Sequence, residues 1–383
     1  MVRVFIPKET GPGETRVGAT PETVKKMIAA GLEVVVEAGA GEASHIADGD
    51  YEGIGAQVAG DGAAALAEAD VVIHVVAPEA AIAGKLKDGA LLVGLLSPFR
   101  NLDLVSALRD QKASSIAMEL VPRISRAQDM DVLSSQASIA GYKAVLLAAQ
   151  RLGKYFPLLM TAAGTIPPAR VVVMGAGVAG LQAVATARRL GAVVEVSDIR
   201  DVVKEQVESL GGKFIELPDM GGGEGEGGYA REMTEEFLRK QREIVAERVS
   251  QADVVICTAL VPGKKAPTLL TAEMVEGMKP GSIVVDLAVE QGGNCVFSEP
   301  GKEVHHGDVL ILGPANLPAE TPIDASSLYA RNVWALFKLM LDEGNLKLDT
   351  EDEIIDGALL THGGEVRHEP TLKALEAEGG SGS

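Results

Sequence analysis

ARVVVMGAGVAG, at residues 169–180, and VVEVSD, at residues 193–198, are the two stretches that decide the fold of this chain. They predict a strand, a glycine-rich turn, a helix and a second strand. Gly175 would make the tight turn, and Gly177 would let a pyrophosphate approach the backbone. Gly180 would let the helix pack closely on the strand. Free N–H groups and the positive dipole end of the helix would then hold the phosphates. The pattern therefore predicts a dinucleotide-binding turn.

Asp198 closes the second strand and gives the turn a nucleotide preference. It follows Gly180 by 18 residues, near the roughly 20 expected for the acid that holds the adenosine ribose hydroxyls. A 2′-phosphate at that position would meet the carboxylate with like charge. The motif therefore favours NAD(H) over NADP(H).

Composition bounds the class of protein. With 383 residues the chain can form two domains, because single cores stop growing near about 250–300 residues. A net charge of −19 argues against nucleic acid and against anionic membrane surfaces as partners. The two cysteines, Cys257 and Cys295, lie in apolar stretches and are expected to be free, buried thiols in a reducing compartment. We expect no metal site, no membrane insertion of this chain, and a cytoplasmic location.

The first part of the chain alternates apolar strands with helices. Pro21 at a first helical position and Gly31 just past the end predict a helix over residues 21–30. Strands are predicted at 2–6, 32–37, 71–76, 90–96 and 115–120. These elements indicate a parallel α/β unit without a glycine fingerprint of its own.

Two long helices, predicted over residues 131–152 and about 326–342, bracket the part of the chain that carries Gly175. The chain therefore leaves the first domain and returns to it, and a hairpin turn at residues 362–365 would complete that domain. The domains are expected to comprise 1–132 with 326–383, and 133–325 for the dinucleotide domain with its interdomain helix. The sequence thus predicts an α/β fold with two Rossmann-like parallel-sheet domains joined by two long helices, with a ligand-binding cleft between them.

RISRAQDMDVLSSQ, at residues 123–136, is dense in side chains that can bind ribose, carboxamide or phosphate. The plainer interpretation is a polar loop with a Ser/Asp helix cap. Its expected position at the mouth of the cleft favours a functional role. Both interpretations stay open on the residues alone.

The chain resembles the NAD(H)-binding component of the proton-translocating nicotinamide nucleotide transhydrogenases, namely the soluble first domain of their alpha subunit. It is similar, more distantly, to alanine dehydrogenases. The resemblance extends over nearly the whole length and rests on long matches, among them MELVPRISR at 118–126, TAAGTIPPAR at 161–170, KEQVESLGGKF at 204–214, TALVPGK at 258–264 and DLAVEQGGN at 286–294.

The resemblance implies a set of nucleotide contacts. Arg123, Gln128, Asp131 and Ser134 would contact the nicotinamide half of NAD(H), the first three as the groups that orient it for reaction. The glycine-rich turn with Asp198 would take the pyrophosphate and the adenosine ribose. A mobile glycine-rich loop would close over the nucleotide through Tyr229. The remaining residues of the implied site are Val178, Arg200, Gly228, Gln241 and Leu260.

Three positions separate the two relatives. Alanine dehydrogenases bind pyruvate with a lysine and a histidine, where this chain has Val76 and Leu95. The acid after the last central strand is Glu290 rather than aspartate. Arg16 remains, but an arginine alone cannot transfer protons at neutral pH. The machinery for a small substrate is missing while the nucleotide turn is intact.

A hydride acceptor must then come on another protein. The resemblance implies a homodimer that docks on an NADP(H)-binding component and a membrane proton-channel component, and that is peripheral to the membrane through those partners. Hydride would pass directly between the two nicotinamides, coupled to proton translocation in the membrane part. Two alternatives remain, a free-standing alanine dehydrogenase-like enzyme and a non-catalytic NAD(H) sensor.

Overall fold

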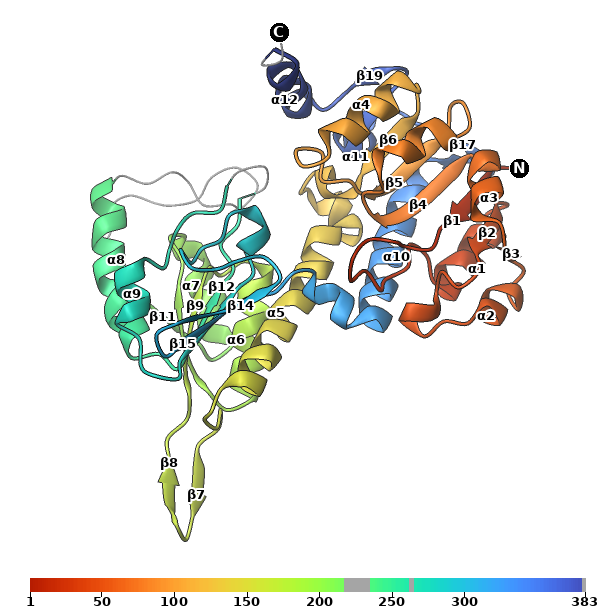
Figure 1. The fold of residues 1–383 in the computed structure, drawn as a ribbon. Helices are drawn as coiled ribbons and strands as arrows, with labels where there is room; N and C mark the ends of the chain where they lie inside the picture. Colours follow the sequence, from red (N-terminus) through yellow and green to blue (C-terminus); the bar gives the residue numbers. More distant parts are fainter. Residues whose placement is uncertain (217–234, 262–264, 381–383) are drawn as a thin grey trace. The chain divides into compact units, whose positions relative to one another are not determined.

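The computed structural model describes residues 1–216, 235–261 and 265–380. The chain divides into two compact units. Unit 1 comprises Met1–Gln136 with Ala319–Ser383, and unit 2 comprises Ala137–Pro318. Each unit is an α/β structure with its own sheet (Figure 1).

The sheet of unit 1 has eight strands in the order β19-β18-β6-β5-β4-β1-β2-β3. Read from β3, its first six strands follow the doubly wound order 3-2-1-4-5-6. They are all parallel, whereas β18 pairs antiparallel with β6 and turns back into β19. The predicted hairpin at 362–365 is confirmed, because Gly363 and Gly364 both have positive φ there. The strands are β1 Arg3–Ile6, β2 Glu33–Glu37, β3 Gln57–Ala59, β4 Val71–Val76, β5 Leu91–Leu95, β6 Ser114–Ala117, β18 Leu359–His362 and β19 Glu365–Val366.

Helices cover both faces of this sheet, since successive strand residues alternate between two buried clusters. The helix α10 begins at Pro322, four residues before the predicted start, because proline is favoured in the first turn. A short hairpin, β16 (Leu341–Asp342) with β17 (Asn345–Leu346), follows α10. The helices are α1 Pro21–Ala29, α2 Asp48–Glu52, α3 Gly62–Glu68, α4 Leu102–Asp110, α10 Pro322–Leu339, α11 Glu353–Ala358 and α12 Glu369–Gly380.

The sheet of unit 2 has seven strands in the order β11-β10-β9-β12-β13-β15-β14. From β11 to β15 it repeats the doubly wound order of unit 1, with all strands parallel. The edge strand β14 is antiparallel and was not predicted. The strands are β9 Arg170–Met174, β10 Val193–Ser197, β11 Lys213–Phe214, β12 Val254–Cys257, β13 Ile283–Asp286, β14 Lys302–His306 and β15 Val309–Gly313.

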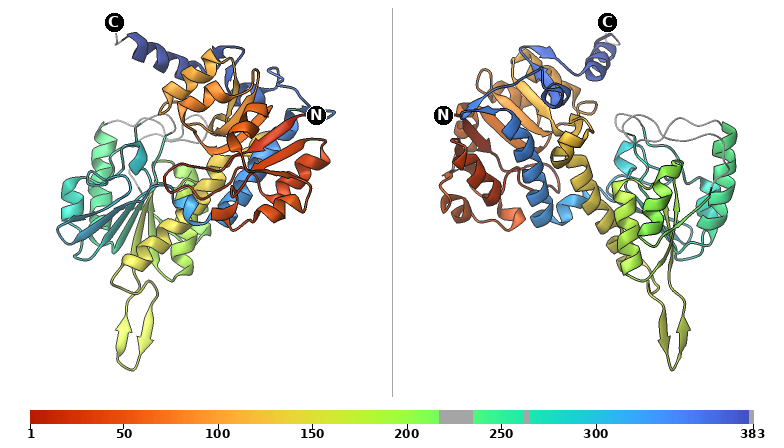
Figure 2. Two further views of the ribbon diagram at one scale, coloured as in Figure 1. Left: turned by 45° about the vertical axis from the view of Figure 1, so that its right-hand side comes forward. Right: turned by 180° about the vertical axis from the view of Figure 1, so that it is seen from behind.

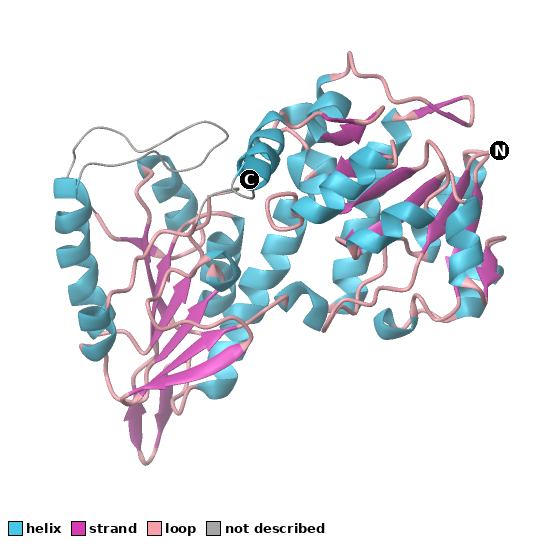
Figure 3. Ribbon diagram, turned by 45° about the horizontal axis from the view of Figure 1, so that its top comes forward, coloured by secondary structure: helices cyan, strands magenta, loops and turns pink. Residues whose placement is uncertain are grey.

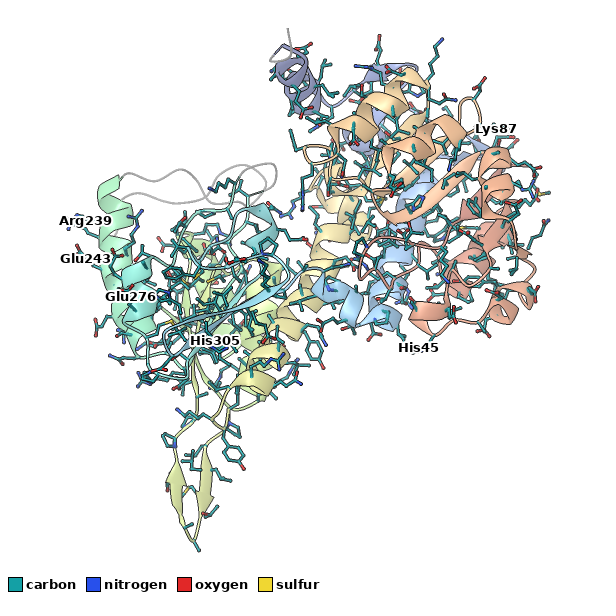
Figure 4. All side chains as sticks on the ribbon, in the orientation of Figure 1. His45, Lys87, Arg239, Glu243, Glu276 and His305 are labelled. Carbon is teal, nitrogen blue, oxygen red and sulfur yellow. The ribbon has the colours of Figure 1, made fainter. Side chains whose placement is uncertain are left out.

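Helices lie on both faces of the sheet of unit 2 (Figure 3). They are α6 Val178–Arg189, α7 Lys204–Ser209, α8 Glu235–Ser250 and α9 Ala272–Glu276. On α8 the Arg239 guanidinium donates to the Glu243 carboxylate over 2.7 Å, one turn along the helix (Figure 4).

The helix α5 (Val132–Arg151) runs from the end of unit 1 into unit 2. A Cβ added to Gly141 would lie 2.1 Å from the Ala179 carbonyl oxygen, so only glycine lets α5 approach the first turn of α6 this closely. By length and composition α5 is the single helix of the described residues that could cross a membrane, with a mean hydropathy of 1.2. Core helices pass the same test, and Ala144, Val145 and Ala148 of α5 are fully buried in unit 2.

A separate β-hairpin, β7 (Leu159–Thr161) with β8 (Gly164–Ile166), extends away from the sheet of unit 2 (Figure 2). Within the described ranges its strands pair only with each other. The side chains of Leu158, Met160 and Ile166 are 54%, 73% and 38% exposed. This unpaired apolar surface was not predicted.

Candidate functional site

The glycine-rich turn has the predicted course, since β9 ends at Met174 and α6 begins at Val178. Gly175 has φ 106°, which strongly favours glycine, and its N–H donates to the Ser197 carbonyl oxygen over 2.8 Å. The turn is therefore tied to the end of β10.

Gly177 and Gly180 differ in the space around them. A Cβ on Gly180 would lie 1.9 Å from the Gly175 carbonyl oxygen, so this glycine permits the close packing of helix and turn. A Cβ on Gly177 would meet no described atom within 4 Å. Gly177 precedes the first helical residue, Val178, which is 40% exposed. The space at Gly177 and the free N–H groups of the helix end together fit a pyrophosphate.

Asp198 lies beside this turn, as predicted. Its Oδ2 accepts the Ala176 N–H over 2.6 Å, and the residue is only 8% exposed. Its carboxylate also receives the Arg200 guanidinium through two nitrogens, Nε at 2.9 Å from Oδ1 and Nη2 at 2.8 Å from Oδ2. The structure thus brings the glycines, Asp198 and Arg200 together.

Thr258 supports the turn from β12, and no role was predicted for it. Its hydroxyl donates to the Gly175 carbonyl oxygen over 2.9 Å. The next residue, Ala259, is held by Asn294, whose side-chain oxygen accepts the Ala259 N–H over 3.1 Å and whose amide donates to the Ala259 carbonyl over 2.9 Å. Leu260 follows in the same loop and is half-buried. The loop after β12 is therefore fixed beside the glycine-rich turn.

Asp286 anchors the loop that carries Asn294. It is fully buried at the end of β13 and accepts the N–H groups of Ala288, Asn294 and Cys295 over 2.8–2.9 Å. The Ser298 hydroxyl adds a fourth bond of 2.6 Å. A charged residue ending an apolar strand, followed by Gly292-Gly293, was the sequence signal for this anchor.

The polar segment 123–136 belongs to unit 1, and its Asp131 and Ser134 bond to each other. The Asp131 carboxylate accepts the Ser134 N–H over 2.9 Å and the Ser134 hydroxyl over 2.6 Å at the start of α5. This geometry is the helix cap that the plainer interpretation predicted. The side chains of Arg123 and Gln128 are exposed on the preceding loop.

That loop contains the 3₁₀ turn η4 (Ser125–Met130) and is fastened to unit 1 at two points. The Arg126 guanidinium forms a two-pronged pair with Asp352, with N–O distances of 2.7 and 2.8 Å. This pair lowers the pKa of Asp352 to about 2. The Asn332 amide donates to the Asp129 carbonyl over 2.7 Å. The loop thus presents Arg123 and Gln128 from a fixed base.

The positions that separate the two similar families lie at the carboxyl ends of β4 and β5. Val76 and Leu95 are register partners there, and both pack against the apolar core. The buried Arg16 guanidinium binds both Glu14 oxygens, over 2.8 and 2.7 Å, and the Gln136 side-chain oxygen over 2.9 Å. This edge of the sheet offers no basic group at Val76 or Leu95.

Three predicted site residues cannot be compared with the structure. Gly228 and Tyr229 lie outside the described residues, as does the glycine-rich loop that contains them. Gln241 lies on α8, but its side chain is outside the described part. Among the residues that the structure describes, no group of three His, Cys, Asp or Glu side chains could hold a metal ion.

Known proteins share both units of this chain. Residues 5–140 match the family "Alanine dehydrogenase/PNT, N-terminal domain", and residues 144–369 match "Alanine dehydrogenase/PNT, C-terminal domain". The chain belongs to the alanine dehydrogenase/PNT family.

Members of the transhydrogenase branch are the more similar relatives. The first of the separately encoded pieces of the NAD(P) transhydrogenase alpha subunit of Rhodospirillum rubrum is 50% identical over 96% of this chain and 98% of its own length. The crystal structure of the transhydrogenase from Sinorhizobium meliloti superposes with a TM-score of 0.87 at 48% identity, covering 95% of this chain and 99% of that one. Alanine dehydrogenase of Mycobacterium tuberculosis is 35% identical over 86% of this chain and 84% of its own length. The resemblance inferred from the motifs and the α/β Rossmann-like fold are confirmed.

Proposed function

We propose that this chain is the NAD(H)-binding component of a proton-translocating transhydrogenase. The observation that carries the proposal is a dinucleotide turn with Asp198 beside it, in a chain with Val76 and Leu95 at the small-substrate positions. A nucleotide bound here has no small acceptor bound by the same chain. The hydride acceptor is then NADP(H) on a partner.

The residues of the site act by binding and positioning. The glycine-rich turn takes the pyrophosphate, and Asp198 takes the adenosine ribose. In unit 1, Arg123, Gln128 and Asp131 orient the nicotinamide half, with Ser134 fixing the Asp131 carboxylate through their hydrogen bonds. Direct transfer requires the two reacting carbons to lie about 3–3.5 Å apart with water excluded. Gly228, Tyr229, Gln241 and Leu260 complete the proposed contacts.

We further propose that two copies of the chain associate through the β7–β8 hairpin. Its exposed apolar side chains resemble an interface rather than a solvated surface. Met160→Lys is expected to shift the mass measured by light scattering from two chains to one. Val193→Lys is the matched control, since Val193 is 43% exposed at the start of β10. A Met160→Lys protein that keeps the double mass would overturn this assignment.

The proposed complex places the chain at the cytoplasmic face of a membrane through its partners. The NADP(H)-binding component supplies the acceptor and a membrane component passes the protons. The nucleotide bound by this chain is NAD(H), because Asp198 repels a 2′-phosphate.

Two assays separate this proposal from its alternatives. NADH should bind the isolated chain in a calorimetric titration, and alanine with NAD⁺ should give no turnover. Sustained alanine oxidation would establish a free-standing dehydrogenase instead. NADH binding without hydride exchange, even with the NADP(H)-binding component added, would establish a sensor.

A further inference from the structure

Arg200 competes with the ribose for Asp198. Four N–H groups reach the two carboxylate oxygens of Asp198, one from Ala176 and three from Arg200, counting the Arg200 backbone N–H at 2.9 Å. A carboxylate has about four acceptor positions. The ribose hydroxyls can therefore bind Asp198 only by displacing donors that already occupy it.

The Arg200 side chain is the displaceable partner. The Ala176 and Arg200 N–H groups belong to the backbone of the turn and of the segment after β10, so they stay with the fold. The guanidinium ends a long side chain that is 15% exposed. Its two bonds to Asp198 match in number the two hydroxyls that a ribose offers.

The same pair changes the electrostatics at the ribose position. Asp198 alone would repel a 2′-phosphate, but the guanidinium at 2.8 Å neutralises much of that charge. Arginine is also the residue that accommodates a 2′-phosphate in NADP(H)-binding turns. Asp198 by itself therefore overstates the preference for NAD(H).

We propose that Arg200 is a specificity-determining residue that weakens NADH binding and retains residual affinity for the 2′-phosphate of NADPH. This inference rests on the proposed function, since it concerns the same nucleotide site. Removal of the guanidinium frees Asp198 for the ribose and leaves its charge unopposed. Removal of the Asp198 charge frees the guanidinium for a 2′-phosphate.

The test is a set of calorimetric titrations of the full chain with NADH and with NADPH. Arg200→Gln should tighten NADH binding about three- to ten-fold and weaken NADPH binding about ten-fold or more. Asp198→Asn should reverse the preference, with NADPH binding more tightly than in the unsubstituted protein. Arg170→Gln is the control for charge, because Arg170 lies at the amino end of β9 and bonds Gln251. That variant should leave both dissociation constants unchanged.

The outcomes distinguish this inference from the proposed function. If the unsubstituted chain binds neither nucleotide, the proposed function is overturned. If it binds NADH, but Arg200→Gln weakens NADH and NADPH binding equally, Arg200 merely supports the turn and this inference is wrong. Unchanged melting temperatures in the variants establish that any shift in affinity arises at the site.

Discussion

The Thr258 hydroxyl donates a hydrogen bond to the Gly175 carbonyl oxygen over 2.9 Å, and that same oxygen lies where a Cβ on Gly180 would fall. One carbonyl group thus joins the turn, the start of α6 and the end of β12. The geometry of the dinucleotide turn depends on contacts from three segments of the chain.

The two glycines on either side of the helix start should respond differently to alanine. Gly180→Ala forces a shift of the Gly175 carbonyl and is expected to cost about 1–3 kcal/mol of unfolding free energy, with loss of NADH binding. Gly177→Ala finds open space, so its stability should change by only a few tenths of a kcal/mol. It should still weaken NADH binding more than ten-fold, because the methyl group occupies the pyrophosphate position. Urea unfolding and calorimetry measure the two effects, and unaltered NADH affinity in Gly177→Ala would contradict this interpretation of the turn.

Asp286 should be a strong determinant of stability. Substitution by asparagine leaves some of three buried backbone N–H groups without a matched acceptor, at a cost of about 2–4 kcal/mol. The urea midpoint measures this loss. Glu303→Gln on the exposed edge strand β14 serves as a control that should stay within about 0.5 kcal/mol. Equal midpoints for the two variants would show that Asp286 does not anchor its loop.

Asp352 should contribute to stability only above acidic pH. Its folded-state pKa of about 2 lies below the roughly 3.9 of an unfolded chain. Its contribution is therefore complete above that unfolded value and is lost as the pH falls toward 2. Asp352→Asn should lower the unfolding free energy at pH 7 by less than about 1 kcal/mol, since the pair with Arg126 is partly exposed. The difference from the unsubstituted protein should vanish near pH 2, and a difference independent of pH would exclude the ion pair as its cause.

Both cysteines should resist thiol reagents in the folded protein. Burial raises the pKa of the Cys295 thiol to about 11 and that of Cys257 well above its usual range. The thiolate, which is the reacting form, is then scarce at pH 8. Ellman's reagent should label no thiol before unfolding and both in urea. Rapid labelling of the folded chain would contradict the burial of these side chains.

The sequence was sufficient where a local pattern determines the structure. The glycine spacing at 175, 177 and 180 predicted the turn, and the apolar runs predicted the central strands. The start of α10 was placed four residues late, although Pro322 was a usable signal. The strands β7 and β8 were missed because they pair only with each other within the described residues, outside any alternating pattern of a sheet.

Contacts between distant segments were beyond the sequence. Nothing in the residues near Asn294 indicates that its amide holds Ala259, 35 residues away. The pair of Asp198 with Arg200 was equally hidden, because spacing predicts proximity but not which donors fill a carboxylate. Residues were identified by chemical type, whereas their partners depend on the packed fold.

Hydride exchange with an NADP(H)-binding component tests the central claim most directly. The chain would be mixed with NADH and with that component carrying NADP⁺, and NADPH formation would be followed in a stopped-flow instrument with nucleotides separated after quenching. We predict that NADPH appears only when both proteins are present, and that Gly177→Ala abolishes it. Failure of the mixture to form NADPH, while the chain still binds NADH, would contradict the account.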